Sequence, residues 1–244
     1  MRPGLPTTGP HVFVPDLDGE VLNVEGDEAH HLHTVLRIRT GDLLSLADAT
    51  GAVAQVVVTG VDRRRVRVEV TDRHDVPAVT PSVCVVQALP KGRKMEEVVQ
   101  RLTELGVDRL RPTVTARTVK QVADKADRVA RWEAVALAAA RQSRRARPLR
   151  IDPIAPWPVS DAVGAVLYEL ADVPLAQALE PLLTPHADAP PEITLAIGPE
   201  GGFEEAEVEQ SGLAPAALGA TILRTETAGV VAASVLLHRL GRLG

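Results

Sequence analysis

The sequence predicts an α/β protein with a small strand-rich region followed by a larger region in which strands and helices alternate. Residues 11–71 contain four short runs rich in β-branched residues, separated by turn signals. From residue 82 onward, short apolar runs alternate with longer amphipathic segments. This alternation is typical of a parallel sheet covered by helices on both faces. The length of 244 residues fits one large domain or two domains.

The N-terminal region is predicted to be a small β-barrel. The expected strands are 11–14, 43–47, 52–61 and 65–70, and one helix over 27–38 interrupts them. Asp27 is a plausible N-cap for that helix. Two prolines in VPAVTPS (76–82) mark a boundary, which predicts domains of residues 1–76 and 77–244.

The larger region is predicted to have five strands and three main helices. The expected strands are 82–89, 107–112, 165–170, 193–197 and 221–224, and the expected helices are 92–106, 123–145 and 228–240. The first of these helices carries an apolar stripe and ends at Gly106. The stripe consists of Met95, Val98, Val99, Leu102 and Leu105.

Composition limits the classes of protein to consider. The chain is 45% hydrophobic and 24% charged, as globular proteins are, but only 2% aromatic, so aliphatic residues must build the core. Cys84 is the only cysteine, which excludes an internal disulfide and a cysteine-based zinc site. No apolar stretch reaches the ~18 residues that span a bilayer, and the start lacks a signal-peptide core. We therefore expect a cytoplasmic protein with no membrane partner.

A basic block lies within an otherwise acidic chain. The net charge is −5, yet residues 81–150 carry 16 Lys and Arg against 7 Asp and Glu. Five of these arginines fall in RQSRRARPLR (141–150). Such a block is a candidate footprint for a polyanion, because arginine binds phosphates and stacks on unpaired bases. A solvated helix end, where cations suit the helix dipole, is the other interpretation.

The stretch IGPEGGF (197–203) places glycines directly after a buried strand. Neither the G-x-G-x-x-G nor the G-K-[ST] nucleotide pattern is present. Glu204 and Glu205 then open a helical segment, where they would repel a phosphate. A cationic or zwitterionic ligand with an adenine ring and no phosphate is compatible with this loop. A tight structural turn is the alternative.

A second glycine-containing loop occurs in LGATILRTETAGVVAA (218–233). Thr225 or Thr227 can cap the helix that follows, and small residues there allow close approach of the backbone to a ligand. Ordinary capping with an Arg224–Glu226 surface pair is the alternative.

Metal and hydrolase chemistry lack support. The spacing of His30, His31 and His33 does not place three imidazoles on one helical face, so they are expected to pack or to contact RNA. Ser143 and Ser234 lie outside any nucleophile-elbow pattern.

Five segments together resemble the ribosomal small-subunit RNA uridine-N3 methyltransferases, the RsmE family of the SPOUT class. They are HHLHTVLRIRTGD, KGRKMEEVVQRLTELGVDRLRP, RWEAVALAAARQSRRARP, IGPEGGF and LGATILRTETA. The resemblance covers nearly the whole chain. It implies a PUA-like RNA-binding barrel followed by a SPOUT α/β domain with a C-terminal trefoil knot. It also implies methylation of N3 of a specific uridine in 16S rRNA of the small ribosomal subunit, with S-adenosylmethionine as cofactor and a homodimer as the active form.

The candidate site residues fall into three sets. Catalysis is assigned to Arg145, with Arg141, which would hold the RNA and support the developing uracil anion, and to Glu200, which would either accept the N3 proton or hold its loop. Cofactor binding is assigned to Glu169, Leu170, Gly198, Pro199, Glu200, Gly201, Gly202, Leu218, Gly219, Ile222, Leu223, Arg224, Thr227 and Ala228. RNA binding is assigned to Arg37, Arg39, Lys91, Arg93, Lys94, Gln142, Ser143, Arg144 and Arg147, with Arg63 to Arg67 as further candidates.

The chain departs from the family in a few places. Ala138 and Arg141 stand where glutamates are frequent, so neither carboxylate is essential here. Arg101 replaces a usual lysine, whereas Gln142, Ser143 and Arg145 match the family's Q-S-x-R. Two other functions stay open: a non-catalytic RNA-binding or ribosome-assembly protein on the same fold, and a methyltransferase with a different base or ribose target.

Overall fold

The computed structural model describes residues 9–118, 125–158, 161–183 and 190–243, which form two compact units. The first unit contains the residues up to Ala78 together with Ala140–Pro148. The second contains Val79–Ala139 and Leu149–Gly244. The predicted division into residues 1–76 and 77–244 does not include one feature of these units. The segment Ala140–Pro148, from the middle of the chain, packs with the N-terminal unit.

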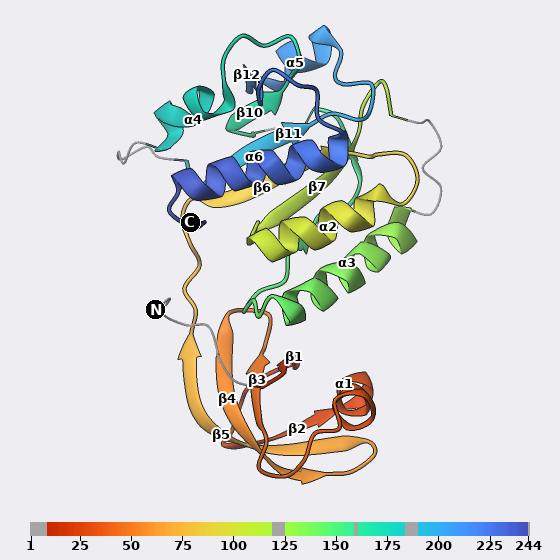
Figure 1. The fold of residues 1–244 in the computed structure, drawn as a ribbon, viewed down its shortest axis with the longest axis vertical. Helices are drawn as coiled ribbons and strands as arrows, with labels where there is room; N and C mark the ends of the chain where they lie inside the picture. The colour runs from red at the N-terminus through yellow and green to blue at the C-terminus, as the bar shows by residue number, and fades with distance from the viewer. Residues whose placement is uncertain (1–8, 119–124, 159–160, 184–189, 244) are drawn as a thin grey trace. The chain divides into compact units, whose positions relative to one another are not determined.

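The N-terminal unit is built on a curled five-stranded sheet, coloured red to orange in Figure 1. Its strands are β1 (His11–Phe13), β2 (Val21–Glu25), β3 (Leu43–Ala47), β4 (Ala52–Val61) and β5 (Arg65–Asp75), in the order β1-β3-β4-β5-β2. β1 and β3 are parallel and the other pairs are antiparallel. Register shifts at Gln55/Val56 and Val58/Gly60 mark irregularities that bend the long β4–β5 ribbon.

A helical turn covers this sheet. It consists of α1 (Gly26–His30) followed by a π-helical turn over His31–Val35, and Ala29 and Leu32 enter the core. The sheet contributes alternating residues to the same core, for example Val66 and Val68 of β5. The aliphatic core that the composition predicts is therefore present in this unit.

The second unit is built on a parallel sheet. Its strands are β6 (Ser82–Ala88), β7 (Arg109–Val114), β8 (Arg150–Ile151), β9 (Ala155–Pro156), β10 (Gly164–Leu167), β11 (Glu192–Ile197) and β12 (Ala214–Ala216). The order is β12-β10-β11-β6-β7-β8, with β9 also on β7, and every pairing is parallel. The helices are α2 (Lys94–Leu105), α3 (Lys125–Gln142), α4 (Leu175–Leu183), α5 (Glu205–Ser211) and α6 (Thr225–Arg239).

Both faces of this sheet are buried, as a parallel sheet requires. Side chains alternate along β6, so Val83 and Val85 join the core under α2 and α6, whereas Cys84 and Val86 join the core with residues of α5. In Figure 1, α2 and α6 lie side by side across one face. The predicted stripe of α2 is confirmed, and the helix ends at Gly106, whose φ of 94° is left-handed.

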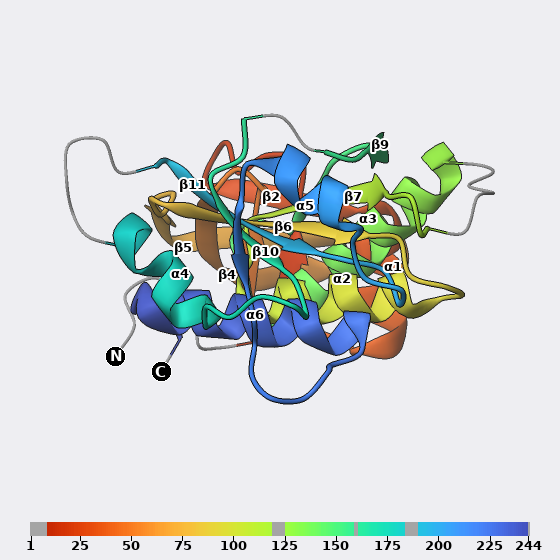
Figure 2. The ribbon, with the colours of Figure 1, turned by 90° about the horizontal axis from the view of Figure 1, so that it is seen from above.

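The strand predicted at 221–224 is wrong. The strand in this part of the chain is β12, and residues 217–224 form the loop that leads into α6, seen as the blue loop in Figure 2. The side chain of Ile222 is 88% exposed, so no sheet face buries this apolar run. The run TILR resembles a strand because β propensity is a local property and does not show where the sheet ends.

Candidate active site

Three loops leave the same edge of the parallel sheet and enclose a cavity of about 520 Å³. They follow the carboxyl ends of β10, β11 and β12, which are neighbours in the sheet. Their contributions are residues 167–169, 197–202 and 216–225, and Lys94 and Ala228 complete the lining. Ligands of open parallel sheets bind at this edge.

The loop after β11 folds back on itself, and two of its glycines leave little room for a side chain. A β-carbon on Gly198 would lie 3.2 Å from the backbone of Gly202 and from the ring of Phe203. Gly202 has a φ of 70°, and a β-carbon there would lie 2.9 Å from Oε1 of Glu169. A side chain at Gly198 would therefore crowd the loop, and one at Gly202 would also strain its left-handed backbone; both glycines line the cavity.

We expect Gly202→Ala to weaken ligand binding in the cavity about tenfold, because its β-carbon displaces the Glu169 carboxylate and its backbone prefers another conformation. The matched control is Gly212→Ala at the end of α5, where φ is 65° and no atom lies within 4 Å of an added β-carbon. Calorimetric titration with S-adenosylmethionine, the cofactor that the resemblance implies, measures the effect. Equal loss of affinity in both variants would show that backbone strain, and not the Glu169 contact, is responsible.

Charged groups bridge the walls of the cavity. Oε1 of Glu200 accepts hydrogen bonds from the Lys91 amide (3.0 Å) and from Nζ of Lys94 (3.4 Å). Nζ of Lys94 also donates to Oε2 of Glu226 (3.2 Å). Burial works to raise the pKa of Glu200, but backbone N–H donors and the Lys94 ammonium outweigh it and lower that pKa. A carboxylate with a lowered pKa is a weak base, so Glu200 is suited to holding its loop rather than to accepting a proton.

A buried hydroxyl connects α6 to the glycine loop. Oγ1 of Thr225 donates to the carbonyl of Gly198 (2.5 Å) and accepts from Nε2 of Gln87 at the end of β6 (2.9 Å). Thr225 is 5% exposed and Gln87 is fully buried. The sequence offers Thr225 or Thr227 as the helix cap, but the N-cap is Arg224, and the Thr225 hydroxyl instead contacts a different loop. Nothing in the local sequence around Gln87 indicates this contact.

A second connection reaches the glycine loop from the segment after β7. Nη1 of Arg117 donates to the carbonyl of Gly201 (2.6 Å). The amide of Ala116 donates to Oε1 of Glu207 (2.8 Å), whose Oε2 accepts from the amide of Glu204 (3.0 Å) in a capping box. The short helix α5 is thereby fixed both to its own start and to the β7 side of the sheet.

We expect Glu207→Ala to lower the free energy of unfolding by about 1–3 kcal/mol, because two backbone amides lose a carboxylate acceptor at once. Urea denaturation followed by circular dichroism measures the loss. Glu209→Ala on the exposed face of the same helix is the control and should change stability little. Matching losses in the two variants would contradict the role of Glu207.

The cavity brings together most of the residues assigned to the cofactor. The assigned residues that line it are Glu169, Gly198, Pro199, Glu200, Gly201, Gly202, Leu218, Gly219, Ile222, Leu223, Arg224 and Ala228. Leu170 and Thr227 are not among the lining residues, and Leu170 is 74% exposed. Lining residues that the sequence did not assign to the cofactor include Lys94, Tyr168, Thr221 and Thr225. They lie beside the recognised motifs or, for Lys94, in a segment read as RNA-binding.

The arginine segment after α3 belongs to the N-terminal unit, where several of its groups make structural contacts. Arg141 forms an ion pair with Glu28. Arg147 donates through Nη1 to the carbonyl of Val76 (2.7 Å). Arg141 and Arg147 thus join this segment to the barrel in addition to contributing charge.

Two further contacts complete this junction. Arg144, at a φ of 57°, donates to the carbonyl of Gly9 (2.8 Å). Nε2 of His11 donates to the carbonyl of Arg145 (2.9 Å), while Nδ1 of His11 pairs with Oγ of Ser45 (2.9 Å). Burial lowers the pKa of His11, which favours the neutral ring in this network. The backbone around Arg145 is therefore held independently of its side chain.

The other residues assigned to RNA are mostly exposed. The exposed ones are Arg37, Arg39, Lys91, Arg93 and Gln142, together with Arg63, Arg64, Arg65 and Arg67 of the β4–β5 ribbon; Ser143 is half-buried. His30, His31 and His33 are also exposed, and the described residues contain no group of three or more His, Cys, Asp or Glu that could hold a metal ion.

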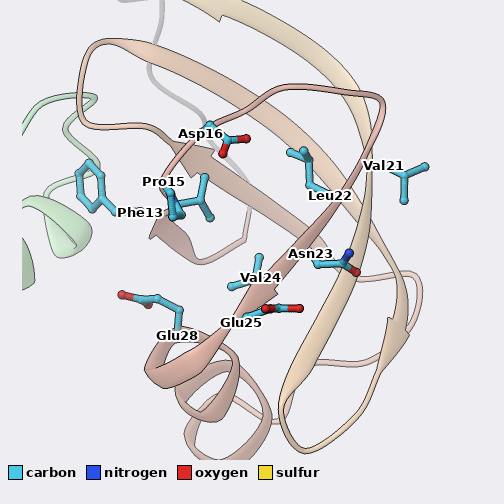
Figure 3. A pocket seen from close by; sticks show the side chains of 10 residues that line it. Phe13, Pro15, Asp16, Val21, Leu22, Asn23, Val24, Glu25 and Glu28 are labelled. Carbon is cyan, nitrogen blue, oxygen red and sulfur yellow. The ribbon is translucent and has the colours of Figure 1, made fainter.

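The N-terminal unit has a hollow of its own, of about 570 Å³, between β1 and β2 (Figure 3). Phe13 and Val24 line it, and the carboxylates of Glu25 and Glu28 lie at its lower side in this view. Glu25 pairs with Arg65 and Glu28 with Arg141. This hollow contains none of the residues assigned to the site.

Comparison with known proteins gives the family. The RNA methyltransferase domain profile matches residues 78–237, and the RNA methyltransferase PUA domain profile matches residues 24–71. The chain is 39% identical over 228 residues to the ribosomal RNA small subunit methyltransferase E of Mycobacterium bovis, covering 88% of this chain and 85% of that relative. The chain belongs to the ribosomal RNA small subunit methyltransferase E family. The Bacillus subtilis member of this family is 29% identical over 91% of both chains.

Solved structures agree with the fold. The methyltransferase E of Neisseria gonorrhoeae bound to S-adenosyl methionine superposes with a TM-score of 0.80 at 24% identity, over 94% of this chain and 97% of that one. A probable rRNA-methyltransferase from Porphyromonas gingivalis gives 0.76 at 28% identity, over 95% and 98%. The predicted fold class, a PUA-like barrel followed by a SPOUT-type α/β domain, is confirmed. Among the described residues, no helix is long and apolar enough to cross a membrane.

Proposed function

We propose that this protein is an S-adenosylmethionine-dependent methyltransferase that methylates N3 of a single uridine in 16S rRNA, the family target uracil 1498, within the small ribosomal subunit. The observation that carries the proposal is the cavity formed by three strand-end loops, two of which are the glycine-containing loops singled out in the sequence. Similarity to a relative crystallised with S-adenosyl methionine supports the choice of ligand. Its working location is proposed to be the cytoplasm.

The cavity chemistry suits S-adenosylmethionine, which carries a sulfonium, an ammonium and a carboxylate but no phosphate. Glu169, Glu200 and Glu226 lie in or beside the cavity wall, where they favour cationic groups over phosphates. Gly198 and Gly202 line the cavity without side chains of their own, which lets a flat adenine ring approach the loop backbone closely.

The reaction is an in-line displacement in which uracil N3 attacks the methyl carbon. The new N–CH3 bond forms as the S–CH3 bond breaks, and S-adenosylhomocysteine leaves with the bonding electron pair. Because the leaving group is already good, the protein contributes mainly positioning and exclusion of water. The N3 proton passes to solvent water, so the uracil anion that develops needs stabilisation, and the target base must be unpaired.

We assign that stabilisation to Arg145, assisted by Arg141. A guanidinium stays charged at all relevant pH values and binds planar anionic groups through two N–H donors. Glu200 is assigned to holding its loop, because its pKa is lowered. RNA contacts are assigned to the exposed cations of both units, among them Arg37, Arg39 and Arg93.

A homodimer is proposed as the active form. Leu170 and Ile222 are 74% and 88% exposed, and both belong to the strand-end loops. Exposed large apolar side chains on loops that border a binding cavity are positions that a partner chain can cover. Light scattering after gel filtration should give twice the mass of one chain, and Ile222→Asp should shift that mass toward one chain.

The decisive experiment is methyl transfer from labelled S-adenosylmethionine to small ribosomal subunits that lack the modification, followed by nucleoside mapping by mass spectrometry. A single 3-methyluridine at the family position is the expected result. Label on another nucleoside would overturn the target while keeping the cofactor. No label in a protein that binds the cofactor would mean that another RNA or assembly state is the substrate. Neither label nor cofactor binding would favour a non-catalytic RNA-binding protein.

A further inference from the structure

Lys94 occupies a position that helix stability does not explain. It is the first residue of α2, where a positive charge opposes the helix dipole. Residues that break a local rule of this kind are often placed for another purpose. Two carboxylates from other elements, those of Glu200 and Glu226, accept hydrogen bonds from its ammonium.

The two acceptors lie on separate walls of the cavity. Glu200 belongs to the glycine loop after β11, and Glu226 lies in the first turn of α6 and is 8% exposed. Lys94 itself lines the cavity from the β6 side. One ammonium therefore connects three segments that are distant in sequence and that border the same cavity.

Backbone donors and this contact together favour the charged form of each carboxylate. The pKa values of both Glu200 and Glu226 are lowered, since backbone donors and Lys94 outweigh the effect of burial. The pKa of Lys94 is raised, chiefly by its hydrogen bond to Glu226. Because two carboxylates offset its charge, the Lys94 ammonium attracts an RNA phosphate less strongly than the exposed Lys91 or Arg93 does.

We propose that Lys94 is a positioning residue for the cofactor, which holds the glycine loop and the first turn of α6 at the separation that S-adenosylmethionine requires, and that it does not bind RNA. The proposal rests on the proposed function, because it names what shapes the cofactor cavity. Loss of the ammonium leaves two neighbouring carboxylates unbridged, so the walls separate and bind the cofactor less well.

The neighbouring Lys91 supplies a matched comparison. Lys91 contacts Glu200 through its backbone amide, and its side chain is exposed. Lys91→Met therefore removes a positive charge from the segment just before α2 but keeps the hydrogen bond to Glu200. Cofactor affinity is measured by calorimetry without RNA, and affinity for small ribosomal subunits is measured without cofactor. Thermal unfolding of each variant checks that it is folded.

We expect Lys94→Met to raise the cofactor Kd about tenfold and to leave subunit affinity unchanged, as loss of a charge-assisted bridge implies. Lys91→Met should lower subunit affinity and leave the cofactor Kd unchanged. Lys94→Arg should restore most of the cofactor affinity, because a guanidinium can serve two carboxylates. Glu226→Ala should weaken cofactor binding alone but add little to Lys94→Met, since each change removes the hydrogen bond between Lys94 and Glu226.

The opposite pattern would overturn the proposal: an unchanged cofactor Kd in Lys94→Met with subunit affinity reduced as in Lys91→Met. If Lys94→Met does not fold, Glu226→Ala decides, and an unchanged cofactor Kd in that variant overturns the proposal. Failure of the wild-type protein to bind S-adenosylmethionine would instead reject the proposed function itself. The two failures are therefore distinguishable.

Discussion

Arg145→Ala is expected to abolish methyl transfer, with turnover reduced by at least about 10²–10³-fold, while S-adenosylmethionine binds as before. Removing one preorganised donor from a developing anion has an effect of this size. Among basic side chains, only the guanidinium of arginine offers two parallel N–H donors to a planar anion. Single-turnover transfer to undermethylated small subunits measures the rate, and calorimetry without RNA measures cofactor affinity.

The structure makes this substitution interpretable. The amide of Arg145 donates to the carbonyl of Ala140 (2.9 Å), and its own carbonyl accepts from His11, so an alanine keeps both backbone bonds. Arg239→Ala, which removes an arginine paired with Glu180 at the end of α6, controls for the loss of one positive charge. If cofactor affinity fell together with transfer in Arg145→Ala, the assignment of Arg145 to the uracil anion would be wrong.

Thr225→Val is expected to lower the free energy of unfolding by about 2–4 kcal/mol and to weaken cofactor binding about tenfold. Valine keeps the shape of threonine but removes a hydroxyl that serves two buried groups, the carbonyl of Gly198 and the amide of Gln87. Both groups would then remain buried without this partner. Because Gly198 begins the glycine loop, the loop should lose its attachment to α6.

Two companion variants separate this explanation from a general helix effect. Thr225→Ser keeps the hydroxyl and should regain most of the stability and affinity. Ser234→Ala removes a hydroxyl from the same helix, but one that donates only locally to the carbonyl of Val230 (2.8 Å), and should cost less than about 0.5 kcal/mol. Chemical denaturation and calorimetric titration measure all three. Equal losses in Thr225→Val and Ser234→Ala would refute the role of Thr225.

Much of the site could be predicted because it consists of backbone loops with local signals. The glycines at 198, 201 and 202 follow a recognisable buried strand, and twelve of the residues assigned to the cofactor line the cavity. Side-chain contacts between distant elements had no such signal. No sequence pattern distinguishes Gln87, Arg117 and Glu207 from other polar residues. Only their hydrogen-bond partners in other elements show that they hold the loops of the site.

The arginine segment at 141–150 also shows what composition does not predict. Its composition predicts a polyanion-binding surface, and that assignment remains a proposal. The structure adds that Arg141, Arg144 and Arg147 also contact groups of the N-terminal unit. Composition counts the charges in a segment, but it does not tell which of them already have partners.

By itself, the sequence determined the alternation of strands and helices, the parallel sheet buried on both faces, the apolar stripe of α2 and the glycine loop after β11. These features depend on periodicity and backbone freedom, which are properties of neighbouring residues. The tertiary structure alone decided the order of the strands, the loop at 217–224 in place of a strand, and the bridge from Lys94 to two carboxylates. These features depend on which distant segments the fold brings together, because hydrogen bonds and ion pairs form only between groups a few ångströms apart.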